Sequence, residues 1–507
     1  MRGLSPCARG RSACSGGILI ILSRQVNPFL YLYDKGSIIY FCEVSNLTLS
    51  EYIESIKNKR ISVVGIGVSN TPWIELLLRS GCDVTACDKR SAEQMGEDAS
   101  KLTALGAKLK LGEDYLEDLD QDIIFRTPGL LPFDEHLETA KAQGSLVTSE
   151  MELFFSLCPC RTIAVTGSDG KTTTTTIISE LLKAQGYRVH LGGNIGKPLL
   201  CELPNIRAED FAVLELSSFQ LHSMYCRPNV AVITNLTPNH LDKHKDFQDY
   251  IDAKRSVFIH QAPEDLLVLN RNDEHSSYYA SFARSRVHWF SDTQPVEDGA
   301  FLDNGVLCRV RGGKRTEIMR AEEIRIPGRH NVQNFLTAFA ATDGLVDPDI
   351  CRSVAMSFQG VEHRLEEVRI RHGVTYINDS IASSPTRTIA GLRAMKRKPI
   401  VIAGGYDKHI PFDSLGDELC LRAKHVILCG ATADKIRDAI LASPAYPGCG
   451  LVYEKIDRFA DAVQAAAALA EEGDIVLLSP ACAAFDQFKN FAERGKTFKK
   501  LVMELPE

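Results

Sequence analysis

Residues 162–176, TIAVTGSDGKTTTTT, have the types and spacing of a loop that binds phosphate. An apolar strand is followed by Gly167 and Gly170, which let backbone N–H groups approach an anion, and then by a helix whose N-terminus carries partial positive charge. Lys171 is expected on the outer phosphates, and Thr172 is expected to offer its hydroxyl to Mg²⁺. The sequence therefore predicts a site for nucleotide phosphates.

The spacing in this loop is shorter than the common one. The common phosphate loop reads G-x-x-x-x-G-K-[ST], and its first glycine would fall on Val165, whereas here Gly167 stands three residues before Gly170. A glycine turn that only caps a βα unit is the alternative. The strand before the turn and the Lys-Thr-Thr after it favour phosphate binding. We assign to the nucleotide the residues Gly167, Ser168, Asp169, Gly170, Lys171, Thr172 and Thr173.

Two polar side chains that follow apolar strands are candidate Mg²⁺ ligands. Glu215 ends the strand FAVLE, and its carboxylate is a hard oxygen ligand suited to Mg²⁺. His240, in TPNHLD, also follows a strand, with Asp242 and His244 close by. A solvated strand-end acid and a structural turn are the alternatives. Beside the phosphate loop, the two side chains together favour a metal site.

Other polar residues occur near predicted domain junctions. Asn331 and Asn334 lie three residues apart on one helical face, where they could contact an adenine edge or satisfy a junction between domains. Arg364 follows His363 in a hinge-like segment and is a candidate for a mobile phosphate contact. Lys254, in YIDAKRSVF, has by composition the character of a surface lysine.

The N-terminal part begins like a nucleotide-binding βαβ unit. The strand and turn ISVVGIGVSN, the helix WIELLLRSG and the strand DVTACD follow one another, and the last strand ends at Asp88. Asn70 stands where the dinucleotide fingerprint has its third glycine, which disfavours a nicotinamide cofactor and still allows a smaller nucleotide. A Thr-Pro-Gly turn at 127–129 follows a further strand.

The length of 507 residues is too great for one core and predicts three domains. Strands alternate with helices throughout, so the fold class is α/β, with Rossmann-like first and last domains and a central phosphate-loop domain whose sheet is mainly parallel. We place the domains at residues 46–157, 158–365 and 366–507. Residues 1–45 are expected to be an extension outside the fold, because their apolar run is short for a secretory signal.

Composition excludes several classes of function. The net charge of -7 and the lack of a basic block argue against nucleic acid as a partner. No apolar run is long enough to span a bilayer, so membrane insertion is not expected. The 15 cysteines are scattered without paired zinc spacing, which indicates reduced thiols in a cytoplasmic protein.

Eight segments in order resemble the Mur ligase family of ATP-dependent amide-forming enzymes: VTGSDGKTTTT, GGNIGKPL, LELSSFQL, NHLDKH, PGRHNVQN, EHRLE, INDSIASSPTRT and LLSPACAAFDQFKNFAERGKTF. The resemblance covers the chain from about Thr48 to its end. It implies a domain for a UDP-sugar substrate, a central ATPase and an amino-acid-binding domain. The last two segments are most similar to the branch that joins D-glutamate to UDP-N-acetylmuramoyl-L-alanine through an acyl phosphate.

The resemblance also implies roles for individual residues. It implies ATP and two Mg²⁺ ions, with Lys254 carbamylated to N6-carboxylysine as a metal ligand. The metal set is Thr172, Glu215, His240 and Lys254, and the catalytic set is Lys171, His240, Lys254 and His363. The ATP side adds Asn331, Asn334, Arg364 and Asp379. The substrate set is Val68, Ser69, Asp88, Lys89, Thr127, Pro128, Gly129, Asn194, Ser383, Lys408 and Phe491.

Two positions depart from the family pattern. Ile381 stands where many members have lysine, and Ala484 stands where many have serine, so Ser383, Lys408 and Phe491 are left to hold the amino-acid carboxylates. A sister ligase or a folylpolyglutamate synthetase-like enzyme is therefore an alternative, which the segment SPACAAFDQFKNF disfavours. A nucleotide-driven switch would explain the phosphate loop alone. We expect a monomer.

Overall fold

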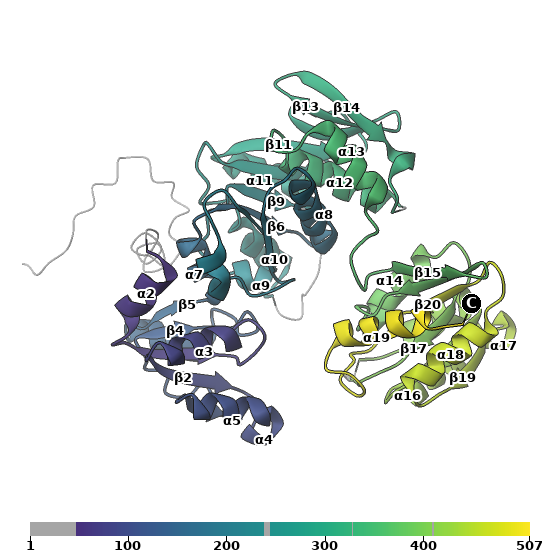
Figure 1. Ribbon diagram of the computed structural model, residues 1–507, viewed down its shortest axis with the longest axis horizontal. Helices are drawn as coiled ribbons and strands as arrows, with labels where there is room; N and C mark the ends of the chain where they lie inside the picture. The colour runs from purple at the N-terminus through teal and green to yellow at the C-terminus, as the bar shows by residue number, and fades with distance from the viewer. Residues whose placement is uncertain (1–46, 238–243, 327, 408–409, 507) are drawn as a thin grey trace, which may run out of the picture.

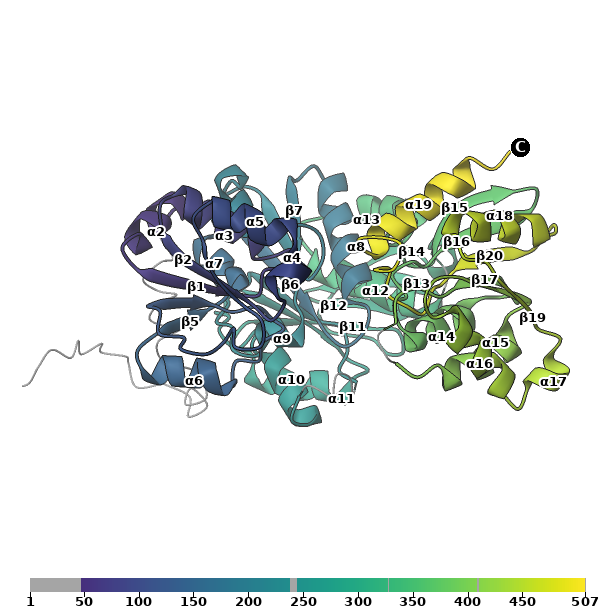
Figure 2. The ribbon, with the colours of Figure 1, turned by 90° about the horizontal axis from the view of Figure 1, so that it is seen from below.

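The computed structural model describes residues 47–237, 244–326, 328–407 and 410–506. Three β-sheets follow one another along the chain, and Figures 1 and 2 show the three units arranged in chain order along the long axis. This confirms the predicted α/β class with three domains. His240, Lys408 and the extension predicted at 1–45 lie outside the described residues.

The first sheet is parallel, with strand order β3-β2-β1-β4-β5. Its helix α2 has Thr48 as its N-cap, because the Thr48 hydroxyl and the Glu51 carboxylate form a capping box. The elements are α2 (Leu49–Ile56), β1 (Arg60–Val64), α3 (Thr71–Arg79), β2 (Asp83–Asp88), α4 (Ala92–Met95), α5 (Glu97–Ala104), β3 (Lys108–Leu111), β4 (Ile123–Phe125), α6 (Glu135–Ala142), β5 (Leu146–Thr148) and α7 (Glu150–Leu157).

The central sheet has nine strands in the order β14-β13-β12-β11-β10-β9-β6-β8-β7, parallel except for the pairs β12–β13 and β13–β14. Its elements are β6 (Arg161–Thr166), α8 (Lys171–Ala184), β7 (Val189–Gly193), η2 (Leu200–Asn205), β8 (Phe211–Glu215), α9 (Ser218–Leu221), β9 (Val230–Ile233), α10 (Phe247–Arg255), β10 (Leu266–Asn270), α11 (Glu274–Tyr279), η3 (Ala280–Phe282), β11 (Arg286–Ser291), β12 (Gly299–Asp303), β13 (Val306–Arg311), β14 (Lys314–Arg320), η4 (Ala321–Glu323), α12 (Arg329–Ala341) and α13 (Pro348–Ser357).

The third sheet has the order β15-β16-β20-β17-β18-β19, with only the edge strand β15 antiparallel. Its elements are β15 (Glu366–Arg371), β16 (Val374–Asn378), α14 (Pro385–Ala394), β17 (Ile400–Ala403), α15 (Asp413–Arg422), β18 (His425–Leu428), α16 (Ala433–Ala442), α17 (Tyr446–Cys449), β19 (Val452–Lys455), α18 (Phe459–Leu469), β20 (Ile475–Leu478) and α19 (Phe491–Met503).

One hydrophobic core is shared by two domains, whereas others lie within a single domain. One face of the central sheet packs under α8 and α12, around Val165 and Phe335. The other face shares a single cluster with the first domain, which runs from Trp73 through Phe154 to Ile233. The clusters of the third domain contain residues of that domain alone. Within the described residues, apolar burial therefore joins the first two domains, and no cluster of buried residues joins the third domain to them.

Two further observations concern cysteines and membranes. The 12 cysteines within the described residues are free, in agreement with the predicted reduced thiols. Among the described helices, none combines the length and apolar character needed to cross a bilayer.

Candidate functional site

The predicted phosphate loop connects β6 to α8. Gly167 and Gly170 have φ values of +142° and +78°, which favour glycine, and Gly170 caps the N-terminus of α8. A Cβ at Gly170 would approach Asn334 Oδ1 to 2.6 Å, so the close packing also requires glycine. Lys171 Nζ donates to the carbonyl oxygens of Gly167 at 3.0 Å and Ser168 at 2.8 Å. The loop thus folds around its own lysine.

The segment after β9 holds the loop in place. Ser168 Oγ donates to Thr237 O at 2.8 Å and lies 2.9 Å from the Tyr250 hydroxyl. Asn235 Oδ1 accepts a hydrogen bond from Asp169 N at 2.9 Å. These contacts come from the neighbouring strand and from α10, so the loop is preorganised by the sheet.

Lys254 is fully buried, and its Nζ donates to Gly167 O at 2.8 Å and to Thr166 Oγ1 at 3.4 Å. It lies 4.6 Å from the centre of the Tyr250 ring. Burial and the Lys171 cation hold the pKa of Lys254 well below its ordinary value. The expectation of a surface lysine was wrong because α10 turns its Tyr250, Ile251 and Lys254 side toward the sheet.

Glu215 ends β8 beside β6, where Val165 is its backbone partner. Its Oε1 accepts a hydrogen bond from Asn194 Nδ2 at 2.8 Å, and its buried Oε2 has no hydrogen-bond partner among the described residues. Lys171 and Lys254 both interact electrostatically with this carboxylate. A buried carboxylate oxygen without a partner is an oxygen ligand suited to Mg²⁺, so the donor set fits a metal.

Asn334 reaches the phosphate loop from α12. Its Oδ1 accepts a hydrogen bond from Thr174 Oγ1 at 3.2 Å, and its Nδ2 donates to Asn331 Oδ1 at 3.3 Å. Thr172 is partly buried and Thr173 is buried in the first turn of α8. The two asparagines therefore stand against the helix that begins at the loop.

His244, the described neighbour of His240, belongs to a second polar cluster. Its Nδ1 lies 2.8 Å from Asp249 Oδ2, and its Nε2 lies 3.0 Å from Ser218 Oγ. His222 Nε2 lies 3.0 Å from the other oxygen of Asp249. The spacing of these three groups could hold a metal ion, but each already has a hydrogen-bond partner. The cluster ties α9 to α10.

Asp379 and two arginines lie where the third domain faces the central one. Asp379 is buried, accepts a hydrogen bond from Ser479 Oγ at 2.8 Å, and has its pKa raised to about 7 by burial. Arg364 and Arg387 interact electrostatically both with Asp379 and with Lys171. The phosphate loop is therefore within electrostatic reach of the third domain.

Arg387 was missed by the sequence reasoning. It lies in the first turn of α14, its Nη1 donates to Ile381 O at 3.2 Å, and it interacts electrostatically with Glu215. The signal was present in SSPTRT, because Ser384 and Pro385 mark a helix start and place Arg387 in its first turn.

His363, near the end of the predicted central domain, packs against residues of the third domain. Its side chain is buried, and its Nδ1 accepts a hydrogen bond from Asn378 Nδ2 at 2.9 Å. The ring lies edge-on to Phe491 at 6.2 Å and packs against Gly495, where a Cβ would approach His363 Nδ1 to 2.3 Å. Phe491 itself is 39% exposed at the start of α19, and Ser383 is partly buried.

The predicted uridine edge lies at the carboxyl end of the first sheet. Asp88 accepts hydrogen bonds from Ile66 N at 2.8 Å and from Arg90 Nε at 2.9 Å. Val68, Ser69 and Lys89 are exposed beside it. Sequence reasoning chose Lys89 and missed Arg90, the residue that pairs with Asp88.

The Thr-Pro-Gly turn packs against the glycine turn of the same edge. A Cβ at Gly65, where φ is +89°, would approach Thr127 Cβ to 2.7 Å, so the two turns touch. Of the next two residues, Pro128 is partly buried and Gly129 is exposed. Asn70, the departure from the dinucleotide fingerprint, donates from Nδ2 to Val64 O at 3.1 Å and to Gly65 O at 3.0 Å. It thereby fixes this turn.

Charged residues of the first domain form hydrogen bonds across its boundary with the central domain. Arg126 is buried, donates to Ser223 Oγ at 2.8 Å and to Leu130 O at 3.1 Å, and has its pKa lowered to about 10 by burial. Glu152 accepts a hydrogen bond from Tyr225 N at 3.0 Å. Glu150 faces Leu200 N, and burial raises its pKa to about 7. No sequence motif indicated these residues.

The chain was compared with known proteins. Residues 165–342 match the model of the Mur ligase middle domain, and residues 363–482 match that of the Mur ligase, glutamate ligase domain. A UDP-N-acetylmuramoylalanine--D-glutamate ligase from Acetivibrio thermocellus is 49% identical over 90% of this chain and 99% of its own length. The chain belongs to the Mur ligase family.

Further relatives agree with this membership. A UDP-N-acetylmuramoylalanine--D-glutamate ligase from Clostridium novyi is 46% identical over 90% of this chain and 99% of its own length. A solved Acinetobacter baumannii structure, UDP-N-acetylmuramoylalanyl-D-glutamyl-2,6-diaminopimelate--D-alanyl-D-alanyl ligase, has the same fold, with a TM-score of 0.55, 16% identity, and coverage of 90% of this chain and 98% of that one. As a Mur ligase, this chain is an ATP-dependent ligase of peptidoglycan synthesis.

Proposed function

We propose that this chain joins the amine of D-glutamate to the L-alanine carboxylate of UDP-N-acetylmuramoyl-L-alanine, at the expense of ATP. The names of the two relatives above, at 49% and 46% identity over nearly their whole length, support this substrate pair. The observation that carries the chemistry is the convergence of Lys171, Lys254 and Glu215 on one phosphate loop.

Each group of the loop has a proposed task. Bound ATP supplies the phosphoryl group that activates the substrate carboxylate and leaves as phosphate when the amine attacks. Lys171 and the amides of the loop bind the phosphates and stabilise the negative charge that develops there. Asn331 and Asn334 position the nucleotide from α12. Arg364 extends the ATP side from the junction with the third domain, and Asp379 extends it from that domain. Preorganisation by the β9 segment supports this assignment.

Lys254 is proposed to be carbamylated. Its amine would attack CO₂, form an N–C bond and release a proton, which converts a cation into a carboxylate-like ligand. The lowered pKa supports this step, because only the neutral amine is a nucleophile. The carbamate, Glu215, Thr172 and His240 would then hold the Mg²⁺ ions, two in number. Catalytic roles for His240 and His363 remain part of the proposal.

The substrates are proposed to lie at the two outer domains. On the UDP-sugar side we propose Val68, Ser69, Asp88, Lys89, Thr127, Pro128, Gly129 and Asn194. On the D-glutamate side we propose Ser383, Lys408 and Phe491. We further propose a monomer with domains at 46–157, 158–365 and 366–507, working in the cytoplasm, where ATP is abundant.

The test is phosphate release with UDP-N-acetylmuramoyl-L-alanine, comparing D-glutamate, L-glutamate, L-lysine and no amino acid. We expect turnover with D-glutamate and little with the others. Equal rates with all amino acids, or turnover with none added, would refute the assignment. A chain lacking residues 1–45 is expected to keep its activity, and loss of active protein would show that this segment belongs to the fold.

A further inference from the structure

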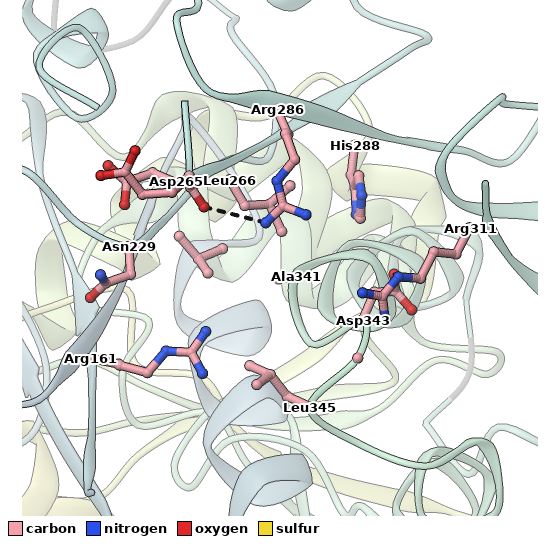
Figure 3. A pocket seen from close by; sticks show the side chains of 13 residues that line it. Arg161, Asn229, Asp265, Leu266, Arg286, His288, Arg311, Ala341, Asp343 and Leu345 are labelled. Atoms are coloured by element: carbon pink, nitrogen blue, oxygen red, sulfur yellow. Dashed lines mark hydrogen bonds and ion pairs between the residues drawn. The ribbon is translucent and has the colours of Figure 1, made fainter. Parts of the chain in front are cut away.

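A cavity of about 290 Å³ lies in the central domain, at the edge of the sheet opposite to the phosphate loop (Figure 3). Four residues that line it, Arg161, Val230, Leu266 and Arg286, are the first residues of β6, β9, β10 and β11. Because these strands are parallel, their first residues share one edge, whereas the phosphate loop follows the last residue of β6. The cavity is therefore separate from the site described above.

Three arginines face this cavity. Figure 3 shows the guanidinium groups of Arg161, Arg286 and Arg311 pointing into it from different sides. Arg161 lies 5.3 Å from the centre of the Phe211 ring and makes no ion pair within the described part of the chain. Arg286 Nη2 donates to the carbonyl oxygen of Glu264 at 3.3 Å. Since a guanidinium has five N–H donors, Arg161 and Arg286 both keep donors for a further partner.

The carboxylates near the cavity are ion-paired, although the buried Oδ2 of Asp343 accepts no hydrogen bond from the described residues. Arg227 pairs with both Glu264 and Asp265, and its Nε lies 2.8 Å from Asp265 Oδ2. Asp343 lies 3.7 Å from Arg311 Nε and is shared with a second, buried arginine. The acids therefore offset Arg227 and part of the charge of Arg311, and they leave Arg161 and Arg286 as the uncompensated cations of the wall.

The backbone and the apolar residues shape the rest of the cavity. Gly344 has φ of +75°, and a Cβ there would approach Arg311 Nη1 to 2.5 Å, so glycine makes room for that guanidinium. Leu266 and Leu345 provide apolar wall. Burial lowers the pKa of His288, which therefore stands in the wall as a neutral ring at neutral pH.

We propose that this cavity binds a small organic anion that carries a phosphate or carboxylate group. The oxyanion lies between Arg161 and Arg286, since planar guanidinium groups pair with such groups through two parallel hydrogen bonds. The carbon part rests on Leu266 and Leu345. The volume is at the lower limit of small-molecule pockets, so the ligand is smaller than a nucleotide.

The experiment is calorimetric titration of the full chain with phosphoglycolate, with ADP and Mg²⁺ present to fill the phosphate loop. Malonate and inorganic phosphate, titrated separately, distinguish a carboxylate ligand from a phosphate ligand. We expect at least one of these anions to bind with a Kd of about 1 mM or tighter. The double variant R161Q/R286Q is expected to weaken that binding at least about tenfold. Both side chains are exposed at the cavity mouth, so the variant should fold.

Two controls make the test decisive. The double variant R320Q/R352Q removes the same charge from exposed ion pairs of the same domain and is expected to bind as the wild type does. Lys171→Ala disables the phosphate loop and is also expected to retain binding. Three outcomes would overturn the proposal. Anion binding could be lost in Lys171→Ala but kept in R161Q/R286Q, it could weaken equally in both double variants, or no anion could bind to the wild type.

A second measurement needs no variant. Phenylglyoxal modifies exposed arginines, and mass spectrometry reports which ones. The anion that binds is expected to protect Arg161 and Arg286 and to leave Arg320 reactive. If the anion changes the modification of none of these three arginines, the proposal is also overturned.

Discussion

The two junctions of the central domain are built differently. Toward the first domain, one hydrophobic cluster crosses the boundary, and Arg126, Glu150 and Glu152 add hydrogen bonds across it. Toward the third domain, no cluster of buried apolar residues crosses the boundary in the described parts of the chain, and Arg364 and Arg387 interact electrostatically with Lys171 of the loop. Apolar burial holds the first domain in place, whereas the position of the third depends on charge. Ligands and salt should therefore act mainly on the second junction.

The largest effect is expected at Lys254, which donates to the phosphate loop. Lys254→Ala should lower turnover about 100- to 1000-fold, because a buried group that positions charge at the phosphates is lost. A short carboxylate such as formate should restore part of the activity by replacing the proposed carbamate. Lys254→Arg keeps a cation that is always protonated, so it should be inactive and not be rescued.

The control for this prediction is Lys183→Ala, an exposed lysine of α8 that pairs with Glu180. Its turnover should match the wild type. Full activity of Lys254→Ala would disprove the carbamate, and rescue of Lys254→Arg would show that the carboxylate acts elsewhere.

The first junction is tested by Arg126→Ala. Removing a buried cation leaves Glu152 without its nearby counter-charge and costs about 3–5 kcal/mol. Calorimetry should show this loss in the transition of the first two domains, with the transition of the third domain unchanged. Arg60→Ala, which removes an exposed ion pair with Asp120, should leave both unfolding transitions unchanged. A parallel shift of both transitions after Arg126→Ala would disprove the separation.

The pH dependence of the first junction follows from Glu150. Its folded-state pKa of about 7 lies above its ordinary value of 4.5, so its contribution to stability is complete below pH 4.5 and is lost as pH rises through 7. Wild-type unfolding free energy should fall by up to about 3 kcal/mol between these limits. Glu150→Gln should lack this component.

Denaturant unfolding of the shared domains at several pH values measures this difference. The exposed Glu54→Gln serves as the charge-matched control and should follow the wild type. Identical pH profiles for Glu150→Gln and wild type would show that Glu150 is not responsible.

The smallest effect is expected at the second junction. Arg387→Gln should lower kcat/KM about tenfold, because one cation near the phosphates is removed, and the deficit should shrink as salt screens the remaining charges. Arg393→Gln, on the same helix but paired with Glu418, is the control. If Arg387→Gln retains wild-type kcat/KM at low salt, the electrostatic account of this junction is wrong.

Local patterns made the strands and turns predictable. The loop at 167–172, the strand ending at Asp88 and the capped helix after Thr48 each carry their signal within a few residues. The burial of Lys254 was not predictable, because it depends on which side of α10 meets the sheet. Arg126 acquires its partners from distant segments, so no spacing in the sequence revealed it. SSPTRT places Arg387 in the first turn of a helix, but its interaction with Glu215 depends on how distant segments pack.

The crossing from the central domain to the third is a single segment between α13 and β15, as Figure 1 shows. Because no cluster of buried apolar residues among the described residues spans this segment, the third domain can be exchanged as a unit. A chimera joined between Phe358 and Glu366 would exchange that domain without exposing apolar surface. A chimera joined between Leu157 and Arg161 would instead exchange the first domain and would disrupt the hydrophobic core that it shares with the central domain. Recombination at the boundary with the third domain would thus keep the hydrophobic cores intact, whereas recombination at the boundary with the first domain would disrupt one of them.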